Sequence, residues 1–229
     1  MLDRFTWYKQ SAFRWKGERL VVYIDPWGLI GDLPQADLVL ISHYHFDHFS
    51  PAGEYRDPNK SFQPKGDGDL AKIVGPKTVI VAPRDVAAEL TGNVKPVGPG
   101  DSIEAAGVKI QCVPAYNTVE ERLGAHPKEN RWVGFIYTLD GTTYYHAGDT
   151  DHLPELDGVK TDVSFVPVGG TYTMDPREAA GLVKRQRPRM AVPMHYGFVV
   201  GEPSSAEAFK KEAAPVEVHV FRPQNTFTL

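Results

Sequence analysis

Residues 42–50, with the sequence SHYHFDHFS, constrain this chain more than any other stretch. They carry His43, His45, Asp47 and His48, directly after an apolar segment. In an extended chain the first three side chains point the same way, so a turn must bring the fourth to the same centre. Imidazole and carboxylate together suit zinc, iron or manganese, and no thiolate is needed. The pattern predicts a metal site with room for two ions, one on the His pair and one on the Asp-His pair.

Length and composition place the chain among ordinary globular proteins. It has 229 residues, 41% of them hydrophobic and 24% charged, which predicts one large domain over residues 1–229 with a sizeable core. The net charge of −4 gives no electrostatic footprint for nucleic acid or an anionic membrane, so neither is an expected partner. Cys112 is the only cysteine, which excludes an internal disulfide and favours a buried apolar role for the thiol.

Targeting signals are not evident in the sequence. The first ten residues, MLDRFTWYKQ, carry charges where a signal peptide needs an apolar core. No apolar run reaches the roughly 18–20 residues that a membrane-spanning helix requires. The expected compartment is therefore the cytoplasm.

Strands dominate the predicted secondary structure. Helices are expected at 69–74, 83–90, from Asp175 to just before Pro188, and at 204–212. Residues 94–139 are predicted to form antiparallel strands, and residues 49–68 a long loop that serves as a lid or substrate wall. Strands are expected at 5–8, 12–15, 19–25, 37–41, 78–82, 110–114, 133–139, 143–146, 162–168, 190–194 and 216–221.

Short apolar runs in this chain repeatedly end in polar, chemically useful residues. Examples are VVYID, LVLISHYH, YYHAGD and AVPMHYG. Buried strands whose ends all present polar groups build a site along one edge of packed sheets, as α/β proteins tend to do. Two further metal ligands are predicted on this basis. Asp149, in AGDTD, could bridge two metals, and His195, in PMHYG, could complete the second site.

Taken together, these motifs resemble the metallo-β-lactamase superfamily over most of the chain. Asp25, the His-x-His-x-Asp-His run, Asp149 and His195 occur in the expected order. The phrases YYHAGDTD and VPMHYG are similar to the branch of stand-alone hydrolases that includes L-ascorbate-6-phosphate lactonase. The resemblance implies an α/β fold, the αβ/βα four-layer sandwich of two mixed β-sheets with helices on the outer faces. It also implies a metal-dependent hydrolase.

The resemblance also implies roles for individual residues. His43 and His45 would hold the first metal, Asp47 and His48 the second, Asp149 would bridge them, and His195 would bind the second. Asp25 would be the carboxylate that orients a ligand imidazole, as metal-bound histidine usually requires.

Two positions depart from the family pattern. Relatives commonly carry a third histidine for the first metal near VPAYN, where this chain has Asn117. His126 follows nine residues later, and imidazole is a better zinc ligand than an amide oxygen, so His126 is the favoured ligand and Asn117 a supporting residue. The choice between them stays open from sequence. Gln10 stands where relatives often carry a histidine, and no role is assigned to it.

Tyr172 and Tyr196 are predicted to contact substrate.

The expected chemistry is attack by a metal-bound hydroxide, with Asp47 or Asp149 holding the hydroxide and accepting a proton. Two divalent ions are expected, zinc first, with manganese, iron or nickel as alternatives. The expected substrate is a small, anionic ester, lactone, amide or phosphodiester. Two other readings stay open, a mononuclear iron enzyme of the sulfur-dioxygenase type and a non-catalytic, metal-stabilised binding module. Homo-oligomerisation is undecided.

Overall fold

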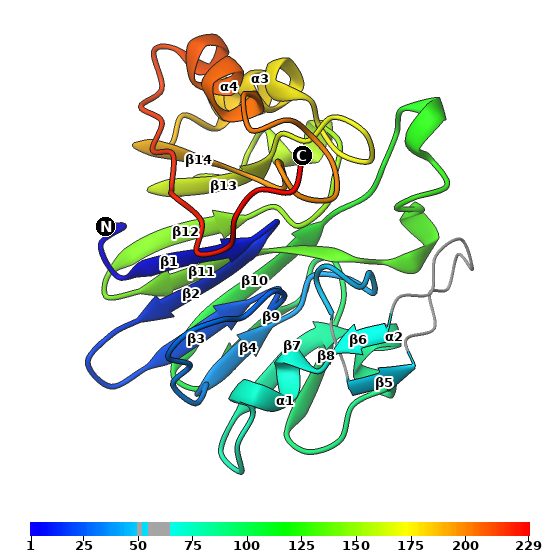
Figure 1. Ribbon diagram of the computed structural model, residues 1–229. Coiled ribbons are helices and arrows are strands. Elements are labelled where there is room, and N and C mark those ends of the chain that lie inside the picture. The colour runs from blue at the N-terminus through cyan, green and yellow to red at the C-terminus, as the bar shows by residue number, and fades with distance from the viewer. Residues whose placement is uncertain (50–51, 55–64) are drawn as a thin grey trace. The chain divides into compact units, whose positions relative to one another are not determined.

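A computed structural model describes residues 1–49, 52–54 and 65–229 of the chain. It divides into two compact units. The first unit contains residues 1–97, 105–107 and 222–226, and the second contains residues 98–104, 108–221 and 227–229. Each unit is organised around one six-stranded sheet (Figure 1).

The first unit holds a mixed sheet that begins with an antiparallel meander and continues with parallel strands. The first three strands pair antiparallel, and the third to the sixth pair parallel. In sheet order the strands are β1 (Phe5–Lys9), β2 (Ala12–Lys16), β3 (Val21–Ile24), β4 (Leu38–Leu40), β7 (Val79–Pro83) and β8 (Val94–Val97).

Aromatic residues fill the meander. The rings of Trp7 and Phe13 stack with centroids 6.1 Å apart, and those of Tyr8 and Tyr23 stack at 6.4 Å. All four side chains are buried. Aromatic side chains suit strands because they pack across neighbouring strands on a pleated surface.

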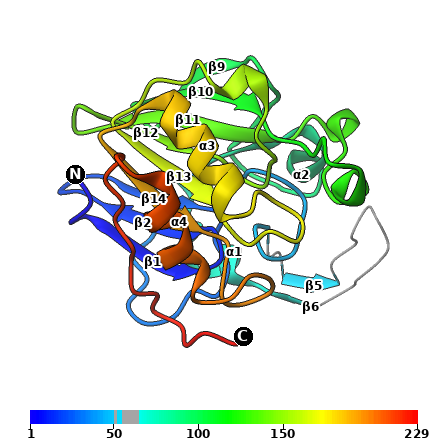
Figure 2. The ribbon, with the colours of Figure 1, turned by 90° about the horizontal axis from the view of Figure 1, so that it is seen from above.

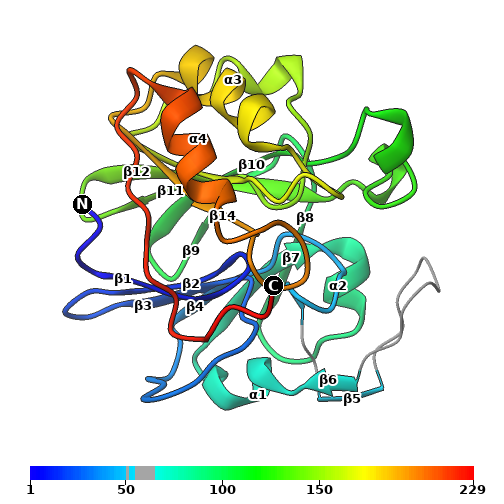
Figure 3. The same cartoon turned by 45° about the horizontal axis from the view of Figure 1, so that its top comes forward.

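One strand of the first unit corrects the sequence prediction. β8 was expected to be antiparallel with the strands that follow it, but it pairs in parallel with β7. The short helix α2 (Arg84–Ala88) joins β7 to β8 and contacts both (Figure 3). A helical crossover returns the chain in the same direction, so the two strands must be parallel. A second short helix of this unit, within its described residues, is α1 (Asp69–Ile73).

The expected loop at residues 49–68 is only partly described. Two short strands, β5 (Ala52–Glu54) and β6 (Lys65–Asp67), pair antiparallel within it. Residues 50–51 and 55–64 lie outside the described part of the chain, and with them the predicted lid.

The second unit holds the other mixed sheet. Its antiparallel strands come first in the chain, and its last three pair parallel. Its short 3-10 helices are η1 (Glu120–Arg122), η2 (Lys128–Asn130) and η3 (Pro154–Leu156). In sheet order the strands are β14 (Met190–Met194), β13 (Val163–Pro167), β12 (Thr142–His146), β11 (Val133–Leu139), β10 (Val108–Pro114) and β9 (Ser102–Ala105).

Two helices pack on one another and against the parallel part of this sheet. α3 (Pro176–Gln186) contacts β13, and α4 (Ser205–Ala213) contacts β14 (Figure 2). α3 begins directly after Asp175, close to the predicted start, and Asp175 caps it: its side chain accepts from the N–H groups of Arg177 and Glu178, and Glu178 accepts in return from the Asp175 N–H. This reciprocal arrangement provides acceptors for backbone N–H groups that have no partner within the first turn of the helix.

The predicted strand at residues 216–221 is wrong. This segment forms one isolated bridge, between Ala191 of β14 and Val218. Ala191 donates to the Glu217 carbonyl, and the His219 N–H donates to the Ala191 carbonyl. A strand requires a repeating ladder of such hydrogen bonds. The alternation of apolar residues predicted a strand here, but it does not ensure that a neighbouring strand is present to pair with.

No helix in the part of the chain that the structure describes is long and apolar enough to cross a membrane.

Candidate metal centre

The two parallel strands at the centre of the first sheet end in the predicted residues. β3 leads into Asp25, and β4 leads through Ile41 and Ser42 into the histidine run. Because β3 and β4 are parallel, their carboxyl ends lie at the same edge of the sheet. Asp25, His43, Asp47 and His48 are buried, and His45 is half-buried. We call Asp25, Ser42, His43, His45, Asp47 and His48 the first cluster.

Asp25 is the hub of the first cluster. Its Oδ1 accepts from the Ser42 N–H at 2.7 Å, and its Oδ2 accepts from the Ser42 hydroxyl at 2.7 Å and from His48 Nδ1 at 2.8 Å. The Ser42 hydroxyl also lies 2.9 Å from His43 Nδ1. Nδ1 of His43 and of His48 is therefore engaged by the protein, and Nε2 is the nitrogen of each ring that would bind a metal. Metal-binding histidines are typically held in this way.

The remaining side chains of the first cluster fit metal coordination. His43 Nε2 and His45 Nδ1 are 3.1 Å apart. Two nitrogens at the usual zinc distance of about 2.0–2.1 Å and a tetrahedral angle would be separated by about 3.3 Å, so the pair matches a shared ion closely. Asp47 Oδ2 lies 3.7 Å from His48 Nε2 and accepts a long hydrogen bond from Gln10 Nε2 at 3.4 Å.

In the second unit, two predicted imidazole ligands converge on the carboxylate of a third predicted ligand, Asp149. Asp149 Oδ2 lies 3.0 Å from His195 Nε2 and 3.3 Å from His126 Nε2. Asp149 follows β12 and His195 follows β14, and these strands run parallel on either side of β13. All three side chains are buried. We call Asn117, His126, Asp149 and His195 the second cluster.

The geometry around Asn117 favours a supporting role for it. Its Oδ1 accepts from the His126 N–H at 3.1 Å and from His126 Nδ1 at 2.8 Å. Its Nδ2 donates to Asp151 Oδ1 at 3.1 Å and to the Tyr172 carbonyl at 3.0 Å. The amide oxygen is thus engaged with His126, whose Nε2 faces Asp149.

Three residues named so far have left-handed backbone. Gln10 has φ 45°, Asp25 has φ 46° and His195 has φ 58°. This conformation is uncommon for residues other than glycine and concentrates at functional sites, where the surrounding structure must hold it. In Asp25 and His195 it falls directly at a strand end and redirects the side chain.

Glycine allows the close approach that seats His195. A Cβ on Gly169, which follows β13, would lie 2.4 Å from the His195 carbonyl oxygen and 2.8 Å from a methyl group of Val200. Non-bonded carbon and oxygen atoms do not approach so closely. Any larger residue at position 169 must therefore displace its own backbone or that of His195.

The two predicted substrate-contacting tyrosines differ in setting. The Tyr172 side chain is 47% exposed. Tyr196 is buried, with its ring 5.8 Å from that of Phe227, and burial, followed by the charge of Glu207, raises the pKa of its hydroxyl. Contact with substrate stays a prediction for both.

Comparisons with known proteins agree with these features. A model of the β-lactamase superfamily domain matches residues 4–195. A UPF0173 metal-dependent hydrolase of Anaeromyxobacter dehalogenans is 34% identical, over 93% of this chain and 82% of that protein. A second, from Pyrococcus abyssi, is 38% identical over 79% of this chain and 75% of that protein.

The chain belongs to the metallo-β-lactamase superfamily. A solved structure described as a metal-dependent hydrolase of Parabacteroides distasonis is 30% identical, with a TM-score of 0.76 over 96% of this chain and 93% of that one. A metallo hydrolase of Ignicoccus hospitalis, 23% identical, shares the fold with a TM-score of 0.69 over 96% of this chain and 94% of that one.

Membership in the metallo-β-lactamase superfamily settles the coarse predictions. The superfamily, its fold with two mixed sheets, and the assignment as a metal-dependent hydrolase are confirmed. The likeness to L-ascorbate-6-phosphate lactonase and the single domain over residues 1–229 stay predictions. So do the individual site residues.

Sequence reasoning missed several residues that contact the predicted ones. Ser42 joins Asp25 to His43, Gln10 contacts Asp47, and Asp151 contacts Asn117. Position offered a signal in two cases, since Ser42 precedes the histidine run and Asp151 follows Asp149 by two residues. Gln10 gave none beyond its departure from the family pattern.

Proposed function

We propose that this protein hydrolyses a small, anionic ester, lactone, amide or phosphodiester, using two divalent metal ions bound by residues of the first and second clusters. The observation that carries the proposal is the pairing of three of the five candidate imidazoles with a supporting group. Asp25 holds His48, Ser42 contacts His43, and Asn117 holds His126. Buried histidines fixed at one nitrogen, with the other turned to a neighbouring imidazole or carboxylate, are built for coordination.

Each cluster contributes proposed ligands. The first cluster would supply His43, His45, Asp47 and His48, and the second would supply His126, His195 and the bridging carboxylate of Asp149. Imidazole and carboxylate donors suit zinc, and manganese, iron and nickel accept the same donors. When bound, such ions lower the pKa of a coordinated water far below that of bulk water, toward about 7, and so supply a nucleophile at neutral pH.

Residues of the chain would complete the reaction. Asp47, which Gln10 contacts and which lies beside His48, would orient the attacking water and take up its proton. Asp149, which faces two imidazoles, would keep the ligand set in place. Tyr172, half of whose side chain is exposed, would donate a hydrogen bond to the substrate oxygen that gains negative charge.

Metal content and a substrate panel test this function together. Protein purified without added metal should contain close to two equivalents of divalent metal by elemental analysis, and should cleave at least one of a panel of generic esters, lactones, amides and phosphodiesters. Asp149→Ala should lower metal affinity by more than about 100-fold and abolish turnover. His219→Ala is the matched control, because that imidazole packs on Phe221, outside both clusters.

Other outcomes would overturn the proposal. Full metal content and activity in Asp149→Ala would remove the bridging role. One equivalent of iron with oxygen uptake would support the mononuclear iron alternative. Bound metal and bound ligand without turnover on any panel member would support a binding module.

A further inference from the structure

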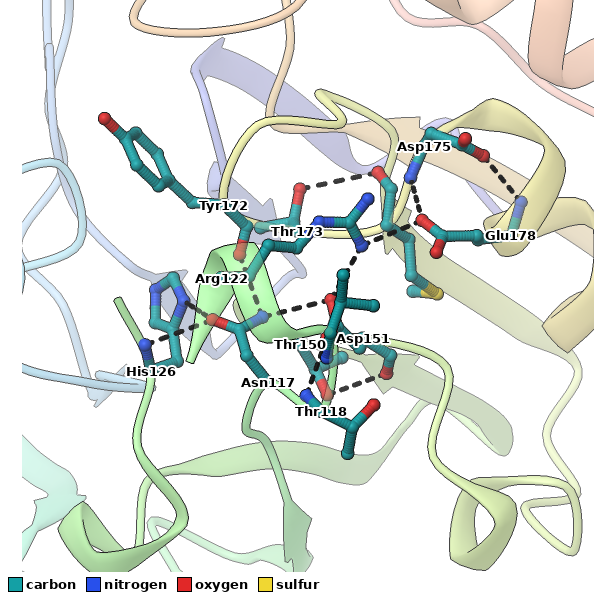
Figure 4. A network of polar contacts seen from close by, with 12 residues as sticks. Asn117, Thr118, Arg122, His126, Thr150, Asp151, Tyr172, Thr173, Asp175 and Glu178 are labelled. Carbon is teal, nitrogen blue, oxygen red and sulfur yellow. Dashed lines mark hydrogen bonds and ion pairs between the residues drawn. The ribbon is translucent and has the colours of Figure 1, made fainter. Parts of the chain in front are cut away.

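Asp151 is buried in the second unit and receives four hydrogen bonds (Figure 4). Its Oδ1 accepts from Asn117 Nδ2 at 3.1 Å and from Arg122 Nη1 at 2.8 Å. Its Oδ2 accepts from the N–H groups of Thr118 and Val119 at 2.7 and 2.9 Å. All four partners are donors, so both oxygens of the carboxylate are needed as acceptors.

These contacts lead from Asp151 to His126 in two steps. Asp151 fixes the Asn117 amide with its nitrogen toward the carboxylate, so that its oxygen faces His126. The opposite amide orientation would set the Asn117 NH₂ group against the His126 backbone N–H, a donor against a donor. Because an amide oxygen can only accept, His126 must carry its proton on Nδ1. Its Nε2, 3.3 Å from Asp149 Oδ2, is then left with a lone pair.

Arg122 links this network to helix α3. Its Nη1 bonds both Asp151 and Glu178, at 2.8 and 2.9 Å, and Glu178 belongs to the capping box of α3. Burial lowers the pKa of Arg122, the two carboxylates raise it, and the net effect is a rise. The segment that carries Asn117 is thus tied to a helix that packs on the sheet.

We propose that Asp151 is a positioning residue: through the Asn117 amide it holds the His126 imidazole with Nδ1 protonated and Nε2 turned toward Asp149. Its importance for metal binding rests on the proposed role of His126 as a ligand. Its effect on the His126 tautomer does not.

Asp151→Asn tests the proposal directly. Each oxygen of Asp151 accepts hydrogen bonds from two donors. In either orientation of the new amide, its NH₂ group would therefore face two donors that have lost their acceptor. Long-range ¹H–¹⁵N spectra of metal-free protein would report the His126 tautomer, with its signals assigned from a His126→Gln variant. Wild type should show the Nδ1–H form, and Asp151→Asn should show a mixture rich in Nε2–H.

Metal affinity gives the second readout, by competition with a chromophoric chelator for zinc. Asp151→Asn should bind about 10–100-fold more weakly, the range typical for residues that support metal-bound histidine. Asp157→Asn is the matched control: it removes a carboxylate that also contacts an imidazole, His152, and should change neither readout.

A folded Asp151→Asn protein that keeps the wild-type tautomer and a zinc affinity within about twofold would overturn the proposal. If circular dichroism shows that Asp151→Asn does not fold, Asn117→Ala decides by the same two readouts, because it removes the acceptor from His126 and leaves Asp151 three donors. His126→Ala separates the two proposals. Unchanged zinc affinity in that variant would refute His126 as a ligand, while the tautomer result would still decide the role of Asp151.

Discussion

At the scale of single residues, three of the proposed imidazole ligands contact a supporting side chain that is not itself a proposed ligand. Asp25 serves His48 directly and His43 through the Ser42 hydroxyl, and Asn117 serves His126. These contacts fix which nitrogen of each ring carries a proton. A metal ion binds the ring nitrogen that carries a lone pair and not the one that carries a proton. Changing a supporting residue should therefore change the metal affinity.

Asp25→Asn should therefore weaken metal binding by about 10–100-fold. The new NH₂ group would face at least one of the Ser42 N–H, the Ser42 hydroxyl and His48 Nδ1, and a buried unsatisfied donor costs about 1–3 kcal/mol of unfolding free energy. Zinc titration and urea unfolding would measure the two effects.

Asp37→Asn is the control for this substitution. Asp37 accepts from the Val21 N–H at 2.8 Å in the same unit, at the opposite end of β4 from the histidine run. It should lose stability and keep its zinc affinity. Equal affinity losses in the two variants would show that Asp25 acts only through general stability.

At the scale of elements, parallel strands bring distant residues to one edge. β12, β13 and β14 are neighbours in parallel, so their carboxyl ends present Asp149, Gly169 and His195 side by side. In the first sheet, β3 and β4 do the same for Asp25 and the histidine run. The absence of a side chain at Gly169 is part of this arrangement, since the His195 carbonyl occupies the space.

Gly169→Ala should displace His195 and cost about 1–3 kcal/mol of unfolding free energy, as overpacking in a filled core does. Zinc affinity should fall as well, because the backbone of a proposed ligand must move. Gly158→Ala is the matched control: its added Cβ would meet no atom within 4 Å. Calorimetry and zinc titration would measure both variants, and the same result for the two would contradict the packing argument.

At the scale of the whole molecule, the proposed ligands come from both compact units. The first unit supplies four of them, His43, His45, Asp47 and His48. The second unit supplies His126, Asp149 and His195. A metal ion bound in either unit would add to the stability of the unit whose residues bind it.

Removing the metal should lower the stability of each unit whose residues bind it. Zinc at 100 times its dissociation constant stabilises a folded protein by about 2.7 kcal/mol relative to the metal-free form. In hydrogen-exchange measurements, the residues after β4 in the first unit and after β12 and β14 in the second should exchange more slowly with zinc than with chelator. Unchanged exchange in one unit would contradict the ligands proposed there.

Much of this protein was predictable from local sequence. The ends of β11 and β14 match the prediction, because buried apolar runs bounded by turns leave little freedom. The start of α3 at Asp175 was predictable for another local reason: an aspartate at this position can accept hydrogen bonds from the first backbone N–H groups of the helix. The histidine run, Asp149 and His195 could be named because metal chemistry restricts the usable side chains.

The sequence by itself thus determined which side chains are available for coordination, and most of the strands that carry them. Only the tertiary structure decided that β8 pairs with β7, that residues 216–221 make a single bridge, and that the Asn117 oxygen faces His126. It also showed Ser42, Gln10 and Asp151 beside the candidate ligands. The reason is physical: propensity and residue chemistry are local, whereas pairing and hydrogen bonding between distant segments depend on how the chain folds back on itself.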